Sequence, residues 1–147
     1  MPRPTPRALP CVALLLAAGC QPAANKPNPM SQSAAPAITN AEWRLVGLGE
    51  RTNPLGAGGR PVTLRLVAEE RSADGFGGCN HYNASYSLRG DSLSFSAAMS
   101  TKMACPDGME LEDAWLQTMP RVVTFAATET SLTLNAAEGP VASFRKP

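Results

Sequence analysis

The chain contains the motif Gly77-Gly78-Cys79-Asn80-His81-Tyr82, followed later by Thr101-Lys102-Met103-Ala104-Cys105. These two motifs begin and end the stretch that is most informative about the fold. Between them, residues 84–95 alternate polar and apolar side chains, and Gly90-Asp91 supplies a two-residue turn. Alternation of period two on both sides of such a turn predicts a β-hairpin. We interpret the two cysteines of this stretch as a disulfide that staples a small β-rich domain.

The N-terminus predicts secretion and a lipid anchor. Two arginines precede a short apolar run, Leu9 to Ala18. A bilayer crossing needs roughly 20 apolar residues, whereas a run of this length is typical of a signal peptide. The run ends in Leu16-Ala17-Ala18-Gly19-Cys20, which resembles a bacterial lipobox. We therefore expect a lipoprotein signal peptide at residues 1–19 and lipidation of Cys20. The alternative is an ordinary secretory signal cut nearby.

All four cysteines of the chain fit this interpretation. Cys11 leaves with the signal peptide, and Cys20 carries the lipid. Cys79 and Cys105 remain as an even pair in a compartment that permits disulfides. Gln21 follows the lipid cysteine, and by resemblance to enteric bacteria the absence of Asp there favours the outer membrane. We expect the protein on the periplasmic side of the envelope, held in the membrane by its lipid.

Composition separates a linker from a folded domain. Residues 20–40 are rich in Pro and Ala and almost uncharged, so we expect a lipid-anchored linker there and one domain at residues 41–147. The chain carries 13 basic and 12 acidic residues, a formal net charge of +1, and no run of basic residues. This pattern lacks the electrostatic footprint of a nucleic-acid partner. We expect no nucleic-acid partner and a monomer.

Periodicity predicts one helix among several strands. The helix is expected from Asp107 to Met119, with Asp107 and Glu110 forming a capping box. Its predicted apolar stripe consists of Met109, Trp115, Leu116 and Met119. The expected strands are residues 42–48, 61–68, 74–78, 84–89, 92–95, 121–126, 130–134 and 140–145. This order favours an α+β domain, in which a curved antiparallel β-sheet forms a partly open barrel or roll with one α-helix packed on it.

Several spaced motifs resemble a known family. They are Gly78-Cys79-Asn80-x-Tyr82-x-x-x-Tyr86, Gly90-x-x-Leu93-x-Phe95, Thr101-x-Met103-Ala104-Cys105 and Met109-x-x-Glu112-x-x-Trp115-Leu116. In this order they resemble the META domain of HslJ-like bacterial lipoproteins. The resemblance implies an envelope-facing domain linked to heat shock or antibiotic tolerance, without an established catalytic activity. It also implies a likeness to the pilotins, cracked barrels that bind a secretin tail or lipid in an apolar groove.

Three kinds of chemistry are open to the cysteines. Redox-active pairs usually have the spacing Cys-x-x-Cys, whereas Cys79 and Cys105 lie far apart in the sequence. Cys79 and His81 resemble a thiol nucleophile and its base, but no third residue is evident that would orient the base. A metal site would draw on these three residues, or for copper(I) on Met99, Met103 and Met109. We prefer a structural disulfide and expect no catalytic residue, metal or cofactor.

Asn80, Tyr82, Thr101 and Met103 are the candidate binding residues. The local alternative for Asn80 is a turn in which the side chain bonds its own backbone. For Tyr82 it is a packed ring with a solvated hydroxyl, and Thr101 would anchor a loop. We expect a non-catalytic envelope protein, related to stress or antibiotic tolerance, that acts by binding an unidentified envelope protein. The alternative is a carrier of lipid or a small hydrophobic ligand, or a pilotin-like chaperone, with a groove between helix and sheet.

Overall fold

The computed structural model describes residues 38–147. The predicted signal peptide, Cys20 and the linker as far as residue 37 lie outside the described residues. None of the described helices has the length and apolar content that a bilayer crossing requires. The strands are β1 (Glu42–Leu48), β2 (Arg51–Thr52), β3 (Thr63–Val67), β4 (Ser72–Phe76), β5 (His81–Arg89), β6 (Ser92–Phe95), β7 (Met99–Ser100), β8 (Thr124–Ala127), β9 (Ser131–Ala136) and β10 (Gly139–Arg145). The helical elements are η1 (Ala57–Gly59), α2 (Met109–Thr118) and η2 (Met119–Arg121).

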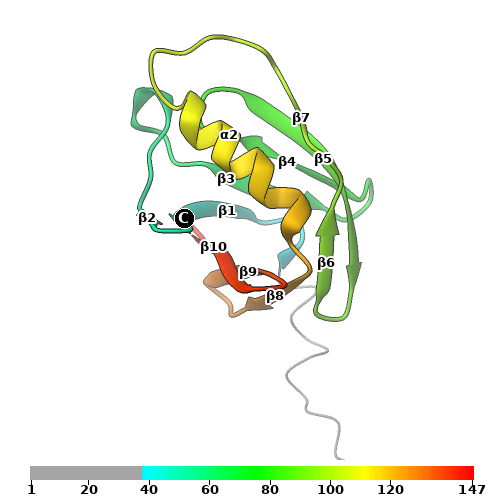
Figure 1. Cartoon of the computed structure of the whole chain (residues 1–147). Helices are drawn as coiled ribbons and strands as arrows, with labels where there is room; N and C mark the ends of the chain where they lie inside the picture. Colours follow the sequence, from blue (N-terminus) through cyan, green and yellow to red (C-terminus); the bar gives the residue numbers. More distant parts are fainter. Residues whose placement is uncertain (1–37) are drawn as a thin grey trace, which may run out of the picture.

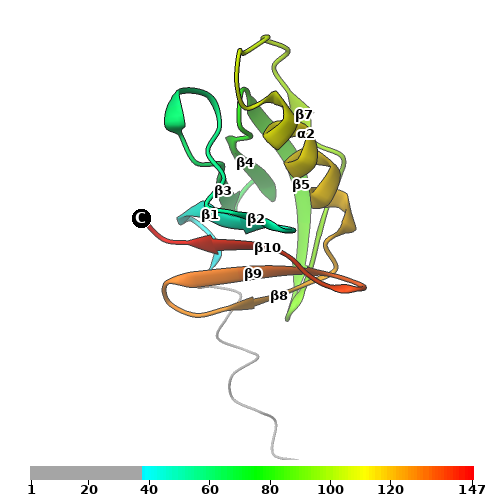
Figure 2. The ribbon, with the colours of Figure 1, turned by 60° about the vertical axis from the view of Figure 1, so that its left-hand side comes forward.

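The strands form an antiparallel barrel, which confirms the predicted fold class. The sheet order is β10-β9-β8-β6-β5-β4-β3-β1-β2, and a further pairing of β1 with β10 closes the ring (Figures 1 and 2). The weakest seam lies between β6 and β8, where the register contains the single pair Ser92 and Thr124. Hydrogen bonds therefore close the barrel, but the strand pairing is shortest at the point where the chain returns from the helix.

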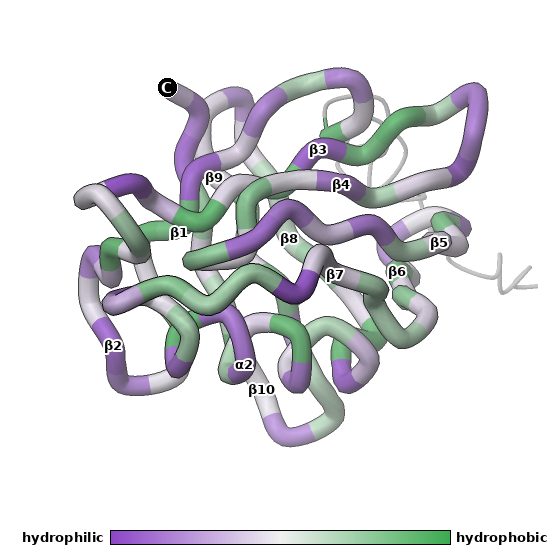
Figure 3. The backbone as a smooth tube through the Cα atoms, turned by 90° about the horizontal axis from the view of Figure 1, so that it is seen from above, coloured by the Kyte–Doolittle hydropathy of each residue, from purple (hydrophilic) through white to green (hydrophobic). Residues whose placement is uncertain are grey.

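Alternate side chains of the strands fill the barrel. Hydrophilic and hydrophobic residues are interspersed along the chain instead of forming separate blocks (Figure 3). Strand geometry sends successive side chains to opposite faces, so the apolar half of each strand lies inside. Five apolar residues of β8, β9 and β10 are all buried: Phe125, Leu132, Leu134, Ala142 and Phe144.

Helix α2 lies across the barrel, and its buried face differs from the predicted stripe (Figure 1). Trp115 and Met119 are fully buried as expected, but Met109 is exposed and Leu111 is buried in its place. The predicted capping box is also wrong, because the N-cap is Gly108 in a left-handed conformation, with no side-chain cap. The helix thus begins after Asp107, and its first turn is placed by backbone packing.

The fold begins earlier than the predicted boundary at residue 41. The Ile38 side chain is fully buried, and the Ile38 carbonyl accepts a hydrogen bond from Nε1 of Trp43 at 3.0 Å. Thr39 forms a parallel bridge with Leu66 of β3. This extension was not predictable from periodicity, because a single apolar residue after a Pro-rich segment forms no repeating pattern. Two short strands, β2 and β7, and the early start of β4 at Ser72 were also not predicted.

Candidate functional site

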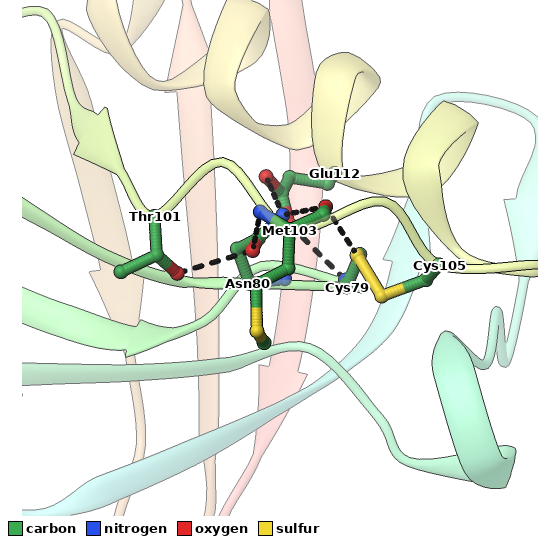
Figure 4. Close-up of a disulfide and its surroundings, with 6 residues drawn as sticks. All are labelled: Cys79, Asn80, Thr101, Met103, Cys105 and Glu112. Carbon is green, nitrogen blue, oxygen red and sulfur yellow. Dashed lines mark hydrogen bonds between the residues drawn. A yellow bond between two sulfur atoms is a disulfide. The ribbon is translucent and has the colours of Figure 1, made fainter.

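The predicted disulfide between Cys79 and Cys105 is present, with Cα atoms 5.8 Å apart (Figure 4). It joins the turn before β5 to the segment that leads into α2. The sulfur of Cys79 is bonded to that of Cys105, so it is not available as the thiol nucleophile considered with His81. The same bond occupies two of the three ligands of the hypothetical Cys79, His81 and Cys105 metal site.

Asn80 links two segments that are distant in sequence. Its Nδ2 donates to the carbonyl of Met103 at 3.1 Å, and its Oδ1 accepts from the backbone N–H of Met103 at 2.9 Å. The hydroxyl of Thr101 donates to the same Oδ1 at 3.1 Å. The local alternative, in which the Asn80 side chain bonds its own backbone, is therefore wrong, because the buried amide is used for tertiary contacts. Three of the four candidate binding residues meet here (Figure 4).

Glu112 completes this cluster from helix α2. Its carboxylate accepts the backbone N–H groups of Cys79 and Asn80, and its Oε1 accepts Nδ2 of Asn80 at 3.1 Å. Glu112 is only 5% exposed, and none of the ion pairs in residues 38–147 involves it. Glu112 was not among the predicted site residues. Its position three residues before Trp115, on the same helix face, was the available signal.

Tyr82, the fourth candidate, belongs to the core. Its hydroxyl donates to the carbonyl of Thr63 at 2.8 Å, and its ring packs edge-on against Trp115 with centroids 6.1 Å apart. Burial raises the pKa of the Tyr82 phenol above its ordinary value. The prediction of a solvated hydroxyl is therefore wrong. A tyrosine inside a barrel can satisfy its hydroxyl with a strand carbonyl left free by the ladder.

Three glycines meet beside the disulfide. The carbonyl of Gly78 accepts the N–H of Ala57 at 2.7 Å. A Cβ atom added at Gly56 or at Gly108 would lie 2.1 Å from that same carbonyl oxygen. Three segments of backbone approach one another too closely for any side chain at this junction. This close approach explains why Gly108, and not a polar side chain, precedes the helix.

His81 lies on the outer surface, away from the buried cluster. Its side chain is exposed and packs edge-on against the ring of Phe76, with centroids 6.0 Å apart. The guanidinium of Arg60 lies over the same ring at 3.9 Å. His81 is thus an exposed side chain packed on an aromatic ring. Neither Phe76 nor Arg60 could orient it as a base.

Residues 99–109, hereafter the strap, carry a group of exposed methionines. Met99 is 76% exposed, Met103 63% and Met109 41%. Met103 and Met109 line a cleft of about 150 Å³ between the strap and α2, which Leu116 and Asp113 also line. We call the three side chains the methionine face. In residues 38–147 the other exposed large hydrophobic side chains are Leu55 and Val123.

The groove expected between helix and sheet is filled. Trp115 is fully buried and packs edge-on against Tyr82 of β5 and Phe144 of β10, with the latter centroids 5.4 Å apart. These two strands lie on opposite sides of the barrel ring. Met119 is fully buried beside them. The helix therefore packs its own side chains against the barrel at the place where the groove was expected.

Comparison with known proteins assigns the chain to a family. No curated protein matches it. An NMR structure of a protein from Burkholderia xenovorans matches with a TM-score of 0.67 and 27% identity, covering 90% of this chain and 99% of that one. A second NMR structure shares the fold, with a TM-score of 0.57 and 17% identity, over 74% of this chain and 91% of the other. The family model of the META domain matches residues 36–147. The chain belongs to the META domain family.

Proposed function

We propose that this chain is a lipid-anchored protein of the bacterial envelope that acts, as a monomer without catalysis, by binding another envelope protein. Its membership of the META family supports a role in the envelope under stress. The lipobox ending in Cys20 supports the anchor. The Cys79–Cys105 disulfide is compatible with an oxidising compartment, where such bonds persist.

The methionine face is the observation that carries the binding role. The strap beneath it is held by a disulfide and by the buried Asn80 and Glu112, while its apolar side chains face water. Met103 and Met109 line the same cleft, and exposed apolar groups that lie together on a surface are typical of interaction sites. Methionine is favoured on such surfaces because its flexible, polarisable side chain adapts to a partner.

Crosslinking in intact cells tests this role. A photoreactive amino acid at position 103 should capture an envelope protein, because that position is exposed and lines the cleft beside α2. The matched control is position 129, where Glu129 is exposed in the turn between β8 and β9. Capture from both positions, or from neither, would contradict binding through this face.

The anchor is tested separately, by intact mass. Protein extracted from membranes and alkylated under denaturing conditions without reductant should carry lipid and no alkyl group. A Cys20→Ser variant should leave the membrane fraction. Variant protein that stays fully membrane-bound would argue against Cys20 as the anchor and would leave the crosslinking result unaffected.

A further inference from the structure

The described methionines divide into two classes. Met99, Met103 and Met109 are exposed, whereas Met119 is fully buried between the helix and the barrel. Oxidation of a thioether requires that the oxidant reach the sulfur, so its rate follows exposure. For Met119 this access requires opening of the core, which occurs in a small fraction of molecules. The same chain therefore contains exposed sites and a buried internal standard.

Hydrogen bonds to its main chain hold Met103 in place, and its side chain is left exposed. The N–H and carbonyl of Met103 both bond to the side chain of Asn80, at 2.9 and 3.1 Å. Its carbonyl oxygen also lies 3.3 Å from Sγ of Cys79. The side chain of Met103 points away from Glu112 (Figure 4). In the described residues the hydrogen bonds that fix Met103 are thus made by its main-chain atoms, and none of them uses the thioether.

We propose that Met99, Met103 and Met109 are modification sites for two-electron oxidants such as hypochlorous acid, and that their oxidation alters the methionine face while the fold is retained. In the reaction the thioether sulfur attacks the oxidant and is oxidised by two electrons. The sulfur gains one oxygen to become a sulfoxide, and chlorine leaves as chloride with the proton of the acid. Sulfoxides are reversible by enzymatic reduction, so the modification is suited to a stressed envelope.

The physical effect is a change of polarity at a fixed position. A sulfoxide converts a flexible apolar side chain into a polar one. Met103 and Met109 are among the residues that line the cleft beside α2, so their oxidation would add polar groups next to it. Binding that depends on apolar contact there would weaken. This consequence for binding rests on the proposed function, whereas the sites of oxidation do not.

Peptide mapping tests the sites. Membrane-extracted full chain is treated with increasing hypochlorous acid, digested, and analysed by mass spectrometry. Met99 and Met103 should react at least about tenfold faster than Met119, because the latter needs local opening. Thermal unfolding followed by circular dichroism should be unchanged at the dose that oxidises the first two. Equal rates at all sites, or loss of the fold at that dose, would overturn the proposal.

Two double variants separate sulfur chemistry from polarity. Met99→Leu with Met103→Leu keeps the surface apolar and removes the oxidisable sulfur at both positions. Met99→Gln with Met103→Gln imitates the polarity of the sulfoxides. With a crosslinker at position 109, the Leu form should keep its capture after oxidant, and the Gln form should lose capture without oxidant. Capture by the Gln form would refute the effect on binding. Absence of capture from every form would count against the proposed function, and the mapping result would still stand.

Discussion

The side chains of Asn80 and Glu112 join the turn before β5 to helix α2, with Nδ2 of Asn80 donating to Oε1 of Glu112 at 3.1 Å. The same carboxylate accepts two backbone N–H groups from that turn. One residue of the helix thus satisfies three buried donors. This polar cluster therefore ties both the helix and the strap to the turn before β5.

Replacing Glu112 by Gln should destabilise the domain by about 1–3 kcal/mol, because the amide NH2 cannot accept the hydrogen bonds that one carboxylate oxygen now receives. The matched control is Glu110→Gln, two positions away on the exposed side of the same helix, where the expected change is within about 0.5 kcal/mol. Urea denaturation gives both values. Equal stability of the two variants would show that the cluster contributes nothing to the fold.

Breaking the disulfide should cost about 3–4 kcal/mol in the chain-entropy model, since Cys79 and Cys105 close a loop with a sequence separation of 26. The variant with Ser at both positions should show a lower denaturation midpoint than the oxidised protein. Reduced wild-type protein should agree with it. If the midpoint does not move on reduction, the bond is not a staple.

The glycine junction predicts a steric effect at Gly56. Ala at this position would place Cβ 2.1 Å from the carbonyl oxygen of Gly78, a rigid backbone atom. We expect a loss of about 3 kcal/mol or more, at the upper end of overpacking costs. At Gly58 an added Cβ meets nothing within 4 Å, but φ is +65°, so Ala there should cost only about 1–2 kcal/mol. Thermal melting of the two variants should rank them in this order.

Burial of Tyr82 predicts a loss of stability in alkali. Its pKa is raised in the folded state, so above about pH 10 the unfolded chain loses the phenolic proton while the folded chain keeps it. The unfolded state then binds fewer protons, and stability falls as the pH rises, by up to about 1.4 kcal/mol per pH unit. In the Tyr82→Phe variant the free energy of unfolding should fall less steeply as the pH rises. Urea denaturation at several alkaline pH values measures this slope. Parallel curves for the two proteins would contradict burial of the ionisable hydroxyl.

The strands were predictable because alternation is local information. Residues 84–95 show two alternating runs around Gly90-Asp91, and the structure contains β5 and β6 joined at that turn. The helix was predicted in place but not in detail. Its N-cap and its buried face depend on the backbone of Gly78 and on the rings of Tyr82 and Phe144, which approach it only in the folded domain.

Periodicity, turn residues and the number of cysteines were enough to predict the antiparallel β-rich class, the cysteine pair and the helix between the strands. That Asn80 and Glu112 share hydrogen bonds, and that Ile38 belongs to the core, became evident from the folded structure. The folded structure also decided that Met109 and Met103 face water. Whether a side chain is buried beside a distant segment depends on contacts formed when the barrel closes, and these are not encoded in any one stretch of the chain.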